Sequence, residues 1–248
     1  MRGKCVLITG ASGGLGREIA LKFAINAINN VSTLILSGRD LDTLKETRDV
    51  CKRAGKGHIV IVSGNLQRKS TIDRLVNCAS KHDVHYLVCC AGEYLRGDVA
   101  NYDIKEILSV LHSNTTATIH LITRMLPLLV KTHGTIIHIN SMAGKNIAPD
   151  EAIYSASKHA MTGFLKSLRF EARRKHIRVL DVFPGVINTP LAAGRALDMM
   201  SPDEVAIVVV FFAMIAEAAK TLQVEELHLG RFRKWALLDE GTYLRRPL

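Results

Sequence analysis

Seven short apolar segments rich in β-branched residues alternate along the chain with six longer segments of helical period. The short segments are residues 6–9, 33–37, 59–63, 85–90, 135–140, 178–183 and 224–229; the longer ones are residues 15–27, 41–54, 70–81, 104–131, 152–175 and 202–219. Strands that are apolar on both faces and alternate with helices form parallel sheets covered on both sides. The pattern therefore predicts an α/β fold, a doubly wound parallel seven-stranded sheet in the order 3-2-1-4-5-6-7 with helices on both faces.

No linker, low-complexity tract or internal repeat interrupts this alternation, so we expect a single domain over residues 1–248. Apolar residues make up 48% and charged residues 23%, which disfavours disorder and disulfide scaffolds. The formal net charge of +10 suits nucleic acid, an anionic membrane or a phosphorylated ligand, but more often it only maintains solubility. With 5% aromatic residues to stack on bases, we expect no nucleic-acid partner.

Five cysteines without CxxC spacing or a His-rich partner segment disfavour a metal site and a disulfide framework. The adjacent Cys89 and Cys90 are either a redox switch or, as is more usual in strands, small buried hydrophobes. The first apolar run is too short for a signal peptide, and the longest, residues 205–216, is shorter than the ~20 residues that cross a bilayer. We therefore expect a cytoplasmic protein that does not enter a membrane.

The first apolar segment runs into a glycine-rich turn, Thr9-Gly10-Ala11-Ser12-Gly13-Gly14-Leu15-Gly16, and a helical segment follows. Glycines are needed where backbone approaches a pyrophosphate closely, and a helix N-terminus offers N–H groups and partial positive charge to phosphates. Glycines also serve ordinary loops, but the position between a strand and a helix favours dinucleotide binding.

The end of the second apolar segment indicates which dinucleotide is bound. NAD sites usually have Asp or Glu there to accept hydrogen bonds from the ribose, whereas this chain has Gly38 and Arg39. A guanidinium offers a 2′-phosphate bidentate, charge-assisted bonds, and Ser12 could add a hydroxyl. We expect NADP(H) to be preferred over NAD(H); the alternative is that Arg39 is a solvated loop residue beside Asp40 and Asp42.

Tyr154 and Lys158 are four residues apart, so they share one face of a helix. A phenol is a poor acid or base at neutral pH, and a neighbouring ammonium favours its phenolate. Such pairs also occur on exposed helices. Here Ser141 ends the preceding strand segment and Asn114 lies in the helical segment before it, and open α/β sheets bind ligands at the carboxyl ends of their strands.

Together these motifs resemble those of the short-chain dehydrogenase/reductase family, in its common single-domain branch with a Rossmann-type fold. The resemblance covers roughly residues 4–190. The glycine turn is similar to the family's TGxxxGxG, and Ser141, Tyr154 and Lys158 match its Ser-Tyr-x-x-x-Lys set, with Asn114 as the fourth catalytic residue. Two further matches are Cys89-Cys90-Ala91-Gly92 to its NNAG and Pro184-Gly185-Val186-Ile187-Asn188-Thr189 to its PGxxxT.

The resemblance implies an NADP(H)-dependent oxidoreductase that interconverts a carbonyl compound and an alcohol by hydride transfer. In reduction Tyr154 is the general acid, Ser141 polarises the substrate oxygen, and Lys158 binds the nicotinamide ribose and favours the phenolate. Asn114 positions a water that relays protons through Lys158. The implied cofactor-binding residues are Gly10, Ser12, Gly14, Leu15, Gly16, Arg39, Asn65, Leu66, Cys90, Ala91, Gly92, Tyr154, Lys158, Pro184, Gly185, Ile187 and Thr189.

The chain departs from the family pattern at three places. Cys89 and Cys90 replace two amide side chains, Asn65 stands where an Asp usually contacts adenine, and a basic, aromatic segment, residues 231–235, stands where a glycine pair is frequent. The alternative function is a non-catalytic nicotinamide-dinucleotide sensor or regulatory protein on the same fold, against which the four intact catalytic residues argue.

The expected partners are a small carbonyl or alcohol substrate and further copies of the chain. Residues 191–200 should cap the pocket, and their apolar members Leu191, Leu197, Met199 and Met200 suggest an apolar substrate of modest size. Two long helical segments, the second carrying Met161, Phe164, Leu165 and Leu168, and the apolar segment 205–216 favour a homodimer or homotetramer.

Overall fold

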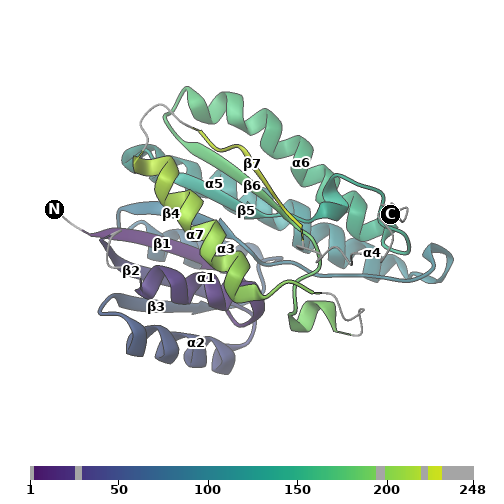
Figure 1. Cartoon of the computed structure of the whole chain (residues 1–248), viewed down its shortest axis with the longest axis horizontal. Helices are drawn as coiled ribbons and strands as arrows, with labels where there is room; N and C mark the ends of the chain where they lie inside the picture. The colour runs from purple at the N-terminus through teal and green to yellow at the C-terminus, as the bar shows by residue number, and fades with distance from the viewer. Residues whose placement is uncertain (1–2, 26–29, 194–198, 219–222, 231–248) are drawn as a thin grey trace, which may run out of the picture.

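The computed structural model of the chain describes residues 3–25, 30–193, 199–218 and 223–230. Within them seven strands form one sheet in the order β3-β2-β1-β4-β5-β6-β7, and every neighbouring pair is parallel (Figure 1). The strands are β1 (Lys4–Thr9), β2 (Val31–Gly38), β3 (His58–Ser63), β4 (Val84–Cys89), β5 (Thr135–Ile139), β6 (Arg178–Pro184) and β7 (Glu226–Leu229). The predicted strand order and parallel direction are confirmed.

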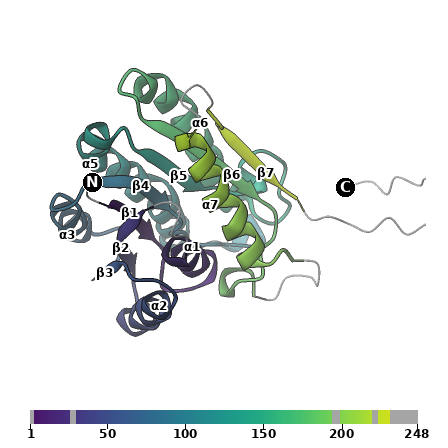
Figure 2. The same cartoon turned by 60° about the vertical axis from the view of Figure 1, so that its left-hand side comes forward.

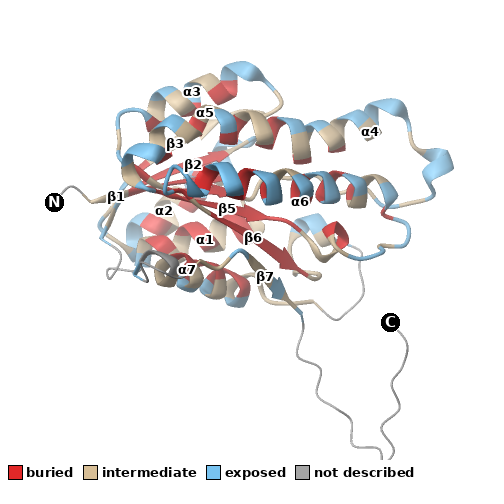
Figure 3. Ribbon diagram, turned by 90° about the horizontal axis from the view of Figure 1, so that it is seen from above, coloured by how far each residue is buried: buried red, intermediate tan, exposed pale blue. Residues whose placement is uncertain are grey.

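Helices cover both faces of the sheet, as Figure 2 shows. One face carries α1 (Gly14–Ile25), α2 (Leu41–Ala54) and α7 (Pro202–Ala218). The other carries α3 (Lys69–Ala79), α5 (Ala117–Thr132) and α6 (Ala152–Arg173), and α4 (Ile104–Leu111) packs against α6. The inner strands β1, β4, β5 and β6 lie largely buried between these layers, whereas the edge strands β3 and β7 are only partly covered and the outward helix faces are exposed (Figure 3).

The alternation of side chains along each strand builds two cores. In β1, Val6 and Ile8 pack with Phe23 of α1, whereas Leu7 packs with Leu121 of α5 on the opposite face. All of these residues are buried. Because both faces are covered, apolar residues occupy consecutive strand positions rather than alternating with polar ones.

Residues 104–131, which were expected to form one helix, instead contain a π-helical turn, His112–Thr116, between α4 and α5. The N–H of Ala117 donates to the carbonyl of His112 across this wider turn. The spacing of apolar residues predicts the helix but not its π-helical turn. One extra residue in a single turn changes that spacing very little. Such π-turns are frequent at functional sites, and this one contains Asn114.

The apolar residues of α6 that favoured an oligomer pack inward: Met161, Leu165 and Leu168 are buried against the sheet, with Phe164 beside them. The helices expose other large apolar side chains, namely Ile104 and Leu108 of α4, Phe170 of α6, and Ile207 and Phe211 of α7. The oligomeric state therefore stays a prediction.

Some expectations fall outside the described residues, among them the helix ends at 26–27 and 219, Leu197, and the segment 231–235. The last strand begins at Glu226, two residues later than expected. Among the described helices, none has both the length and the apolar character needed to cross a membrane.

Candidate active site

A cavity of about 870 Å³ opens at the carboxyl ends of the strands, the edge to which the arrows of Figure 1 point. Parallel strands deliver their carboxyl-terminal loops to the same edge, so residues distant in sequence meet there. Every residue predicted for the site lines this cavity except Asn114.

The glycine turn packs so closely that side chains are excluded. Gly10 has φ +69°, and a Cβ there would lie 2.8 Å from the main-chain nitrogen of Ala91. A Cβ on Gly16 would collide with the carbonyl oxygen of Gly10. This packing sets the N-terminus of α1 at the cavity wall, where its unpaired N–H groups can face an anion.

One polar atom in this turn is left without a partner. The Oγ atom of Ser12 is buried and has no hydrogen-bond partner among the described residues, although Ser12 lines the cavity. Buried hydroxyls are normally hydrogen-bonded, because leaving one unpaired costs free energy. The orphaned hydroxyl, the glycine turn and the helix N-terminus together fit the phosphates of a dinucleotide.

Cys89 ends β4, and Cys90, directly after it, lies beside the glycine turn. Thr9 Oγ1 accepts hydrogen bonds from the N–H groups of Cys90 and Ala91, each at 3.2 Å. Burial raises the pKa of both Cys89 and Cys90 to about 12. Because the thiolate is the reactive form, these thiols are unreactive at neutral pH, which favours the packing interpretation over a redox switch.

Arg39 lines the cavity directly after β2 and pairs with a residue that the sequence did not single out. Its Nη1 atom is 2.8 Å from Oε1 of Glu93, which follows β4. The neighbouring acids have other partners: Asp40 caps α2 by accepting from the N–H of Thr43, and Asp42 pairs with Lys45. Arg39 is therefore not neutralised by the acids beside it in the sequence.

Tyr154 and Lys158 both lie on α6 and face the cavity, yet both are less than 10% exposed. The Nζ atom of Lys158 is 5.7 Å from the centroid of the Tyr154 ring and donates to the carbonyl of Ile139 at 3.0 Å. The rings of Tyr94 and Tyr154 pack edge to face, with their centroids 4.9 Å apart. These contacts hold the phenol and the ammonium side by side in a confined site.

Ser141 follows β5 and caps a short 3₁₀ turn, Met142–Gly144. Its Oγ atom accepts a hydrogen bond from the N–H of Ala143 at 3.1 Å. Because this bond uses an acceptor position, the hydroxyl hydrogen is available to donate to a ligand in the cavity.

A buried network of polar side chains fixes the backbone at Ser141. Asn140 Nδ2 donates to Asp181 Oδ2 at 2.9 Å and to Thr162 Oγ1 at 3.0 Å, while its Oδ1 accepts the N–H of Ser141. His138 pairs with the other carboxylate oxygen of Asp181 at 2.8 Å. Burial lowers the pKa of His138, against the opposing effect of Asp181, so the neutral ring donates Nδ1–H.

Asn114 lies behind the cavity wall, 1% exposed. Its side chain bonds both main-chain groups of Glu93, at 2.7 and 2.8 Å, and the Oγ atom of Ser157 at 3.0 Å. The amide is thus committed to joining the loop after β4 to α6. That Asn114 positions a water that relays protons through Lys158 stays a prediction.

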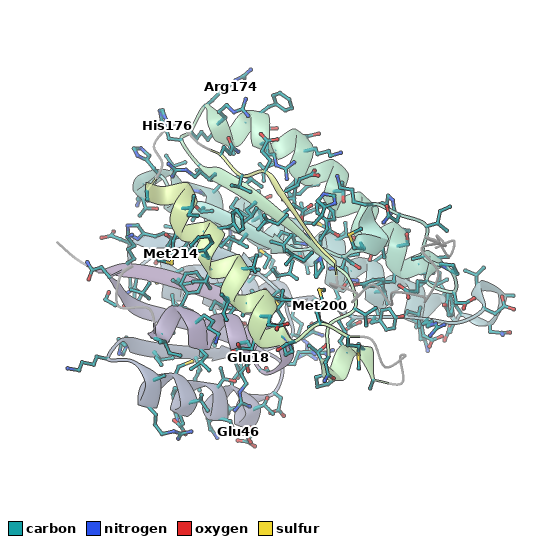
Figure 4. The ribbon with its side chains drawn as sticks, in the orientation of Figure 1. Glu18, Glu46, Arg174, His176, Met200 and Met214 are labelled. Atoms are coloured by element: carbon teal, nitrogen blue, oxygen red, sulfur yellow. The ribbon has the colours of Figure 1, made fainter. Side chains whose placement is uncertain are left out.

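The structure adds residues on the substrate side that the motifs did not identify. Tyr94 donates its hydroxyl to the buried carboxylate of Glu151 at 2.8 Å, and both line the cavity. Their positions, Tyr94 two residues after Gly92 and Glu151 three residues before Tyr154, were the available signal. Of the expected cap, Leu191 lines the cavity, whereas Met200 pairs its backbone with Ile187 near the start of α7 (Figure 4).

Comparison with known proteins places the chain in a family. The family model of the short chain dehydrogenases matches residues 4–199. A dehydrogenase/reductase SDR family protein 7-like of Drosophila melanogaster is 35% identical over 193 residues, 77% of this chain and 59% of that protein. A ketoacyl reductase of Nostoc is 30% identical over 220 residues, 85% of this chain and 75% of that protein.

Solved structures show the same fold. The alcohol dehydrogenase of the archaeon Thermococcus sibiricus, complexed with 5-hydroxy-NADP, has a TM-score of 0.82 at 20% identity, covering 93% of this chain and 99% of that chain. The actinorhodin polyketide ketoreductase with NADPH has a TM-score of 0.80 at 24% identity, covering 91% and 95%. By its matched motifs, fold and relatives, the chain belongs to the short chain dehydrogenase family of oxidoreductases, nucleotide-binding enzymes that act on CH–OH or carbonyl groups.

Proposed function

We propose that this protein is an NADP(H)-dependent oxidoreductase that interconverts a carbonyl compound and an alcohol, with Tyr154 as general acid and base. The observation that carries the proposal is that Ser141, Tyr154 and Lys158 line the same cavity as the glycine turn and Arg39. Acid–base groups and a dinucleotide cradle in one cavity are what hydride transfer with proton transfer requires.

The cofactor would lie along the carboxyl edge of the sheet. Its pyrophosphate would meet the N-terminus of α1 and the Ser12 hydroxyl, its adenine would lie near Asn65 and Leu66, and Arg39 would bind the 2′-phosphate. The residues assigned to the nicotinamide end are Lys158, Pro184, Gly185, Ile187 and Thr189, all of which line the cavity.

The preference for NADP(H) is supported by charge and by space at the end of β2. Arg39 is a cation at the cavity wall, and Gly38 places no carboxylate there. A Cβ on Gly38 would collide with the Oγ atom of Ser12, so an acidic residue is not accommodated at this position unless Ser12 moves. Both features favour a phosphorylated over an unphosphorylated ribose.

When bound, the nicotinamide supplies or accepts the hydride. For reduction, Ser141 donates its free hydroxyl hydrogen to the carbonyl oxygen and Tyr154 transfers its phenolic proton to that oxygen. The Lys158 ammonium, held by the Ile139 carbonyl, stabilises the resulting phenolate. Tyr94 and the buried position of Tyr154 limit the access of water to the phenol.

The test is a screen of alcohols, hydroxy acids, sugars and steroids with both cofactors, comparing wild type with Tyr154→Phe. We expect turnover in wild type and a fall of about 10²- to 10⁴-fold in the variant, the range for losing a general acid. Calorimetry should find NADPH affinity nearly unchanged, because only one hydroxyl is lost.

Two results would contradict the proposal. If Tyr154→Phe keeps most of the wild-type turnover number, Tyr154 is not the general acid. If wild type binds the cofactor yet turns over no compound in either direction, the sensor alternative replaces the enzyme.

A further inference from the structure

An ion pair spans the adenosine end of the cavity. Arg39, at the end of β2, reaches Glu93 of the loop after β4, with 2.8 Å between Nη1 and Oε1. The two residues are 54 positions apart and both line the cavity, so the pair joins its two walls. Arg39, the cation assigned to the 2′-phosphate, is therefore already paired with a carboxylate.

The two partners of this pair are held very differently. Glu93 Oε2 accepts a hydrogen bond from Ser109 Oγ at 2.7 Å, and the Asn114 side chain holds both main-chain groups of Glu93. The side chain of Glu93 is 21% exposed, whereas that of Arg39 is 66% exposed. The carboxylate is therefore the fixed member and the guanidinium is the member that can move.

Exchange of partners at Arg39 is energetically easy. An ion pair with one largely exposed member contributes little to stability, because water screens it. A phosphate offers the guanidinium a bidentate, charge-assisted contact that is stronger. When Arg39 turns to a phosphate, Glu93 keeps its bond to Ser109, so no buried group loses its last partner.

We infer that Glu93 is a specificity-determining residue that competes with the 2′-phosphate for Arg39 and so narrows the preference for the phosphorylated cofactor. This inference rests on the proposed function, because it takes the cavity to be the dinucleotide site. Glu93 acts through Arg39. A 2′-phosphate must displace the Glu93 carboxylate from Arg39 before it binds there, whereas an unphosphorylated ribose leaves the ion pair intact.

The experiment is calorimetric titration with adenosine 2′,5′-bisphosphate and adenosine 5′-monophosphate, which share the adenosine end and need no turnover. The variant is Glu93→Gln, whose amide can still pair with Ser109, and the matched control is Asp42→Asn, which removes an exposed carboxylate paired with Lys45. Both titrations are repeated in the Arg39→Ala background.

We expect Glu93→Gln to raise the affinity for the bisphosphate relative to the monophosphate about two- to fivefold, the scale of an exposed ion pair. Asp42→Asn should leave this ratio unchanged, and the gain should vanish with Arg39→Ala. If Glu93→Gln leaves the ratio of bisphosphate to monophosphate affinity unchanged or lowers it, the inference is wrong and the proposed function stands. The same holds if Glu93→Gln raises this ratio equally in the Arg39→Ala background, because Glu93 would then only repel the phosphate by its charge. Failure of wild type to bind either nucleotide overturns the proposed function together with the inference.

Discussion

The two ends of the cavity are built in opposite ways. At the end that carries the proposed catalytic residues, Tyr154 and Lys158 are buried, and Asn140 joins Ser141 to Asp181 by hydrogen bonds. At the end proposed to bind adenosine, Arg39 is largely exposed, and within the described residues its ion pair is with Glu93. Groups that move a proton need a fixed geometry, whereas a group that selects a ligand can rearrange on binding.

Replacing Ser141 should have the largest effect among the variants that probe this comparison. Ser141→Ala removes a donor to the substrate oxygen, so kcat should fall about 10²- to 10³-fold. The matched control is Ser155→Ala, because Ser155 Oγ also bonds Ala143 but the residue does not line the cavity. Steady-state kinetics of both variants would contradict the assignment if they lost activity equally.

At the proposed adenosine end, Arg39→Ala should change the relative affinity for NADPH and NADH without changing the rate of the chemical step. A charge-assisted contact to a phosphate is worth about 1.5–3 kcal/mol, so NADPH affinity should fall roughly 10- to 150-fold while NADH affinity hardly changes. Arg48→Ala, which removes an α2 guanidinium paired with Asp49 outside the cavity, is the control. Calorimetric titrations that find both cofactors weakened alike would make Arg39 a solvated loop residue.

Replacing an asparagine by alanine should lower the free energy of unfolding by different amounts at the two ends of the cavity. Asn140→Ala leaves the buried Asp181 with one partner fewer and should reduce the free energy of unfolding by about 1–3 kcal/mol. Asn65→Ala removes a part-exposed bond to the N–H of Gln67 and should cost about 0.5 kcal/mol. Urea denaturation of both variants measures the contrast, and equal losses would refute the idea that only the catalytic end is rigidly supported.

The smallest effect concerns pH and the anchoring of the segment after Ser141. Glu226 of β7 pairs with Lys145 at 2.6 Å and with Arg169 of α6 at 3.4 Å. Burial alone would raise the pKa of Glu226, but bonds from Lys145 and His228, the charge of Lys145 and a bond from Arg169 outweigh it and lower the pKa from 4.5 to about 2.

Because the folded-state pKa of Glu226 is depressed, its stabilisation is present above about pH 4.5 and is lost as pH falls towards 2. Glu226→Gln should therefore lose less stability than wild type between pH 5 and 3, by about 1 kcal/mol after solvent screening. Denaturation at a series of pH values tests this. Parallel pH profiles would show that the pair contributes nothing.

Much of the fold was predictable from local patterns. Short β-branched runs and helical period predicted the alternating strands and helices, and the strand order expected of such a doubly wound sheet is confirmed. The glycine turn, Ser141, Tyr154 and Lys158 all meet in the cavity. These features are predictable because parallel strands bring their carboxyl ends to one edge, so a motif's position after a strand already places it. The π-turn around Asn114 was missed, because a single extra residue barely disturbs helical period.

The sequence by itself determined the sheet, its covering helices and which residues reach the carboxyl edge, since these depend on side-chain period and on the fixed geometry of parallel crossovers. Only the tertiary structure decided the partners: Arg39 pairs with Glu93 rather than Asp40, Asn114 bonds the Glu93 main chain, and Tyr94 meets Glu151. Each such pair joins different loops or helices, and a hydrogen bond forms only within about 3 Å. Distances that short between distant segments are set by how the layers pack, which no local pattern records.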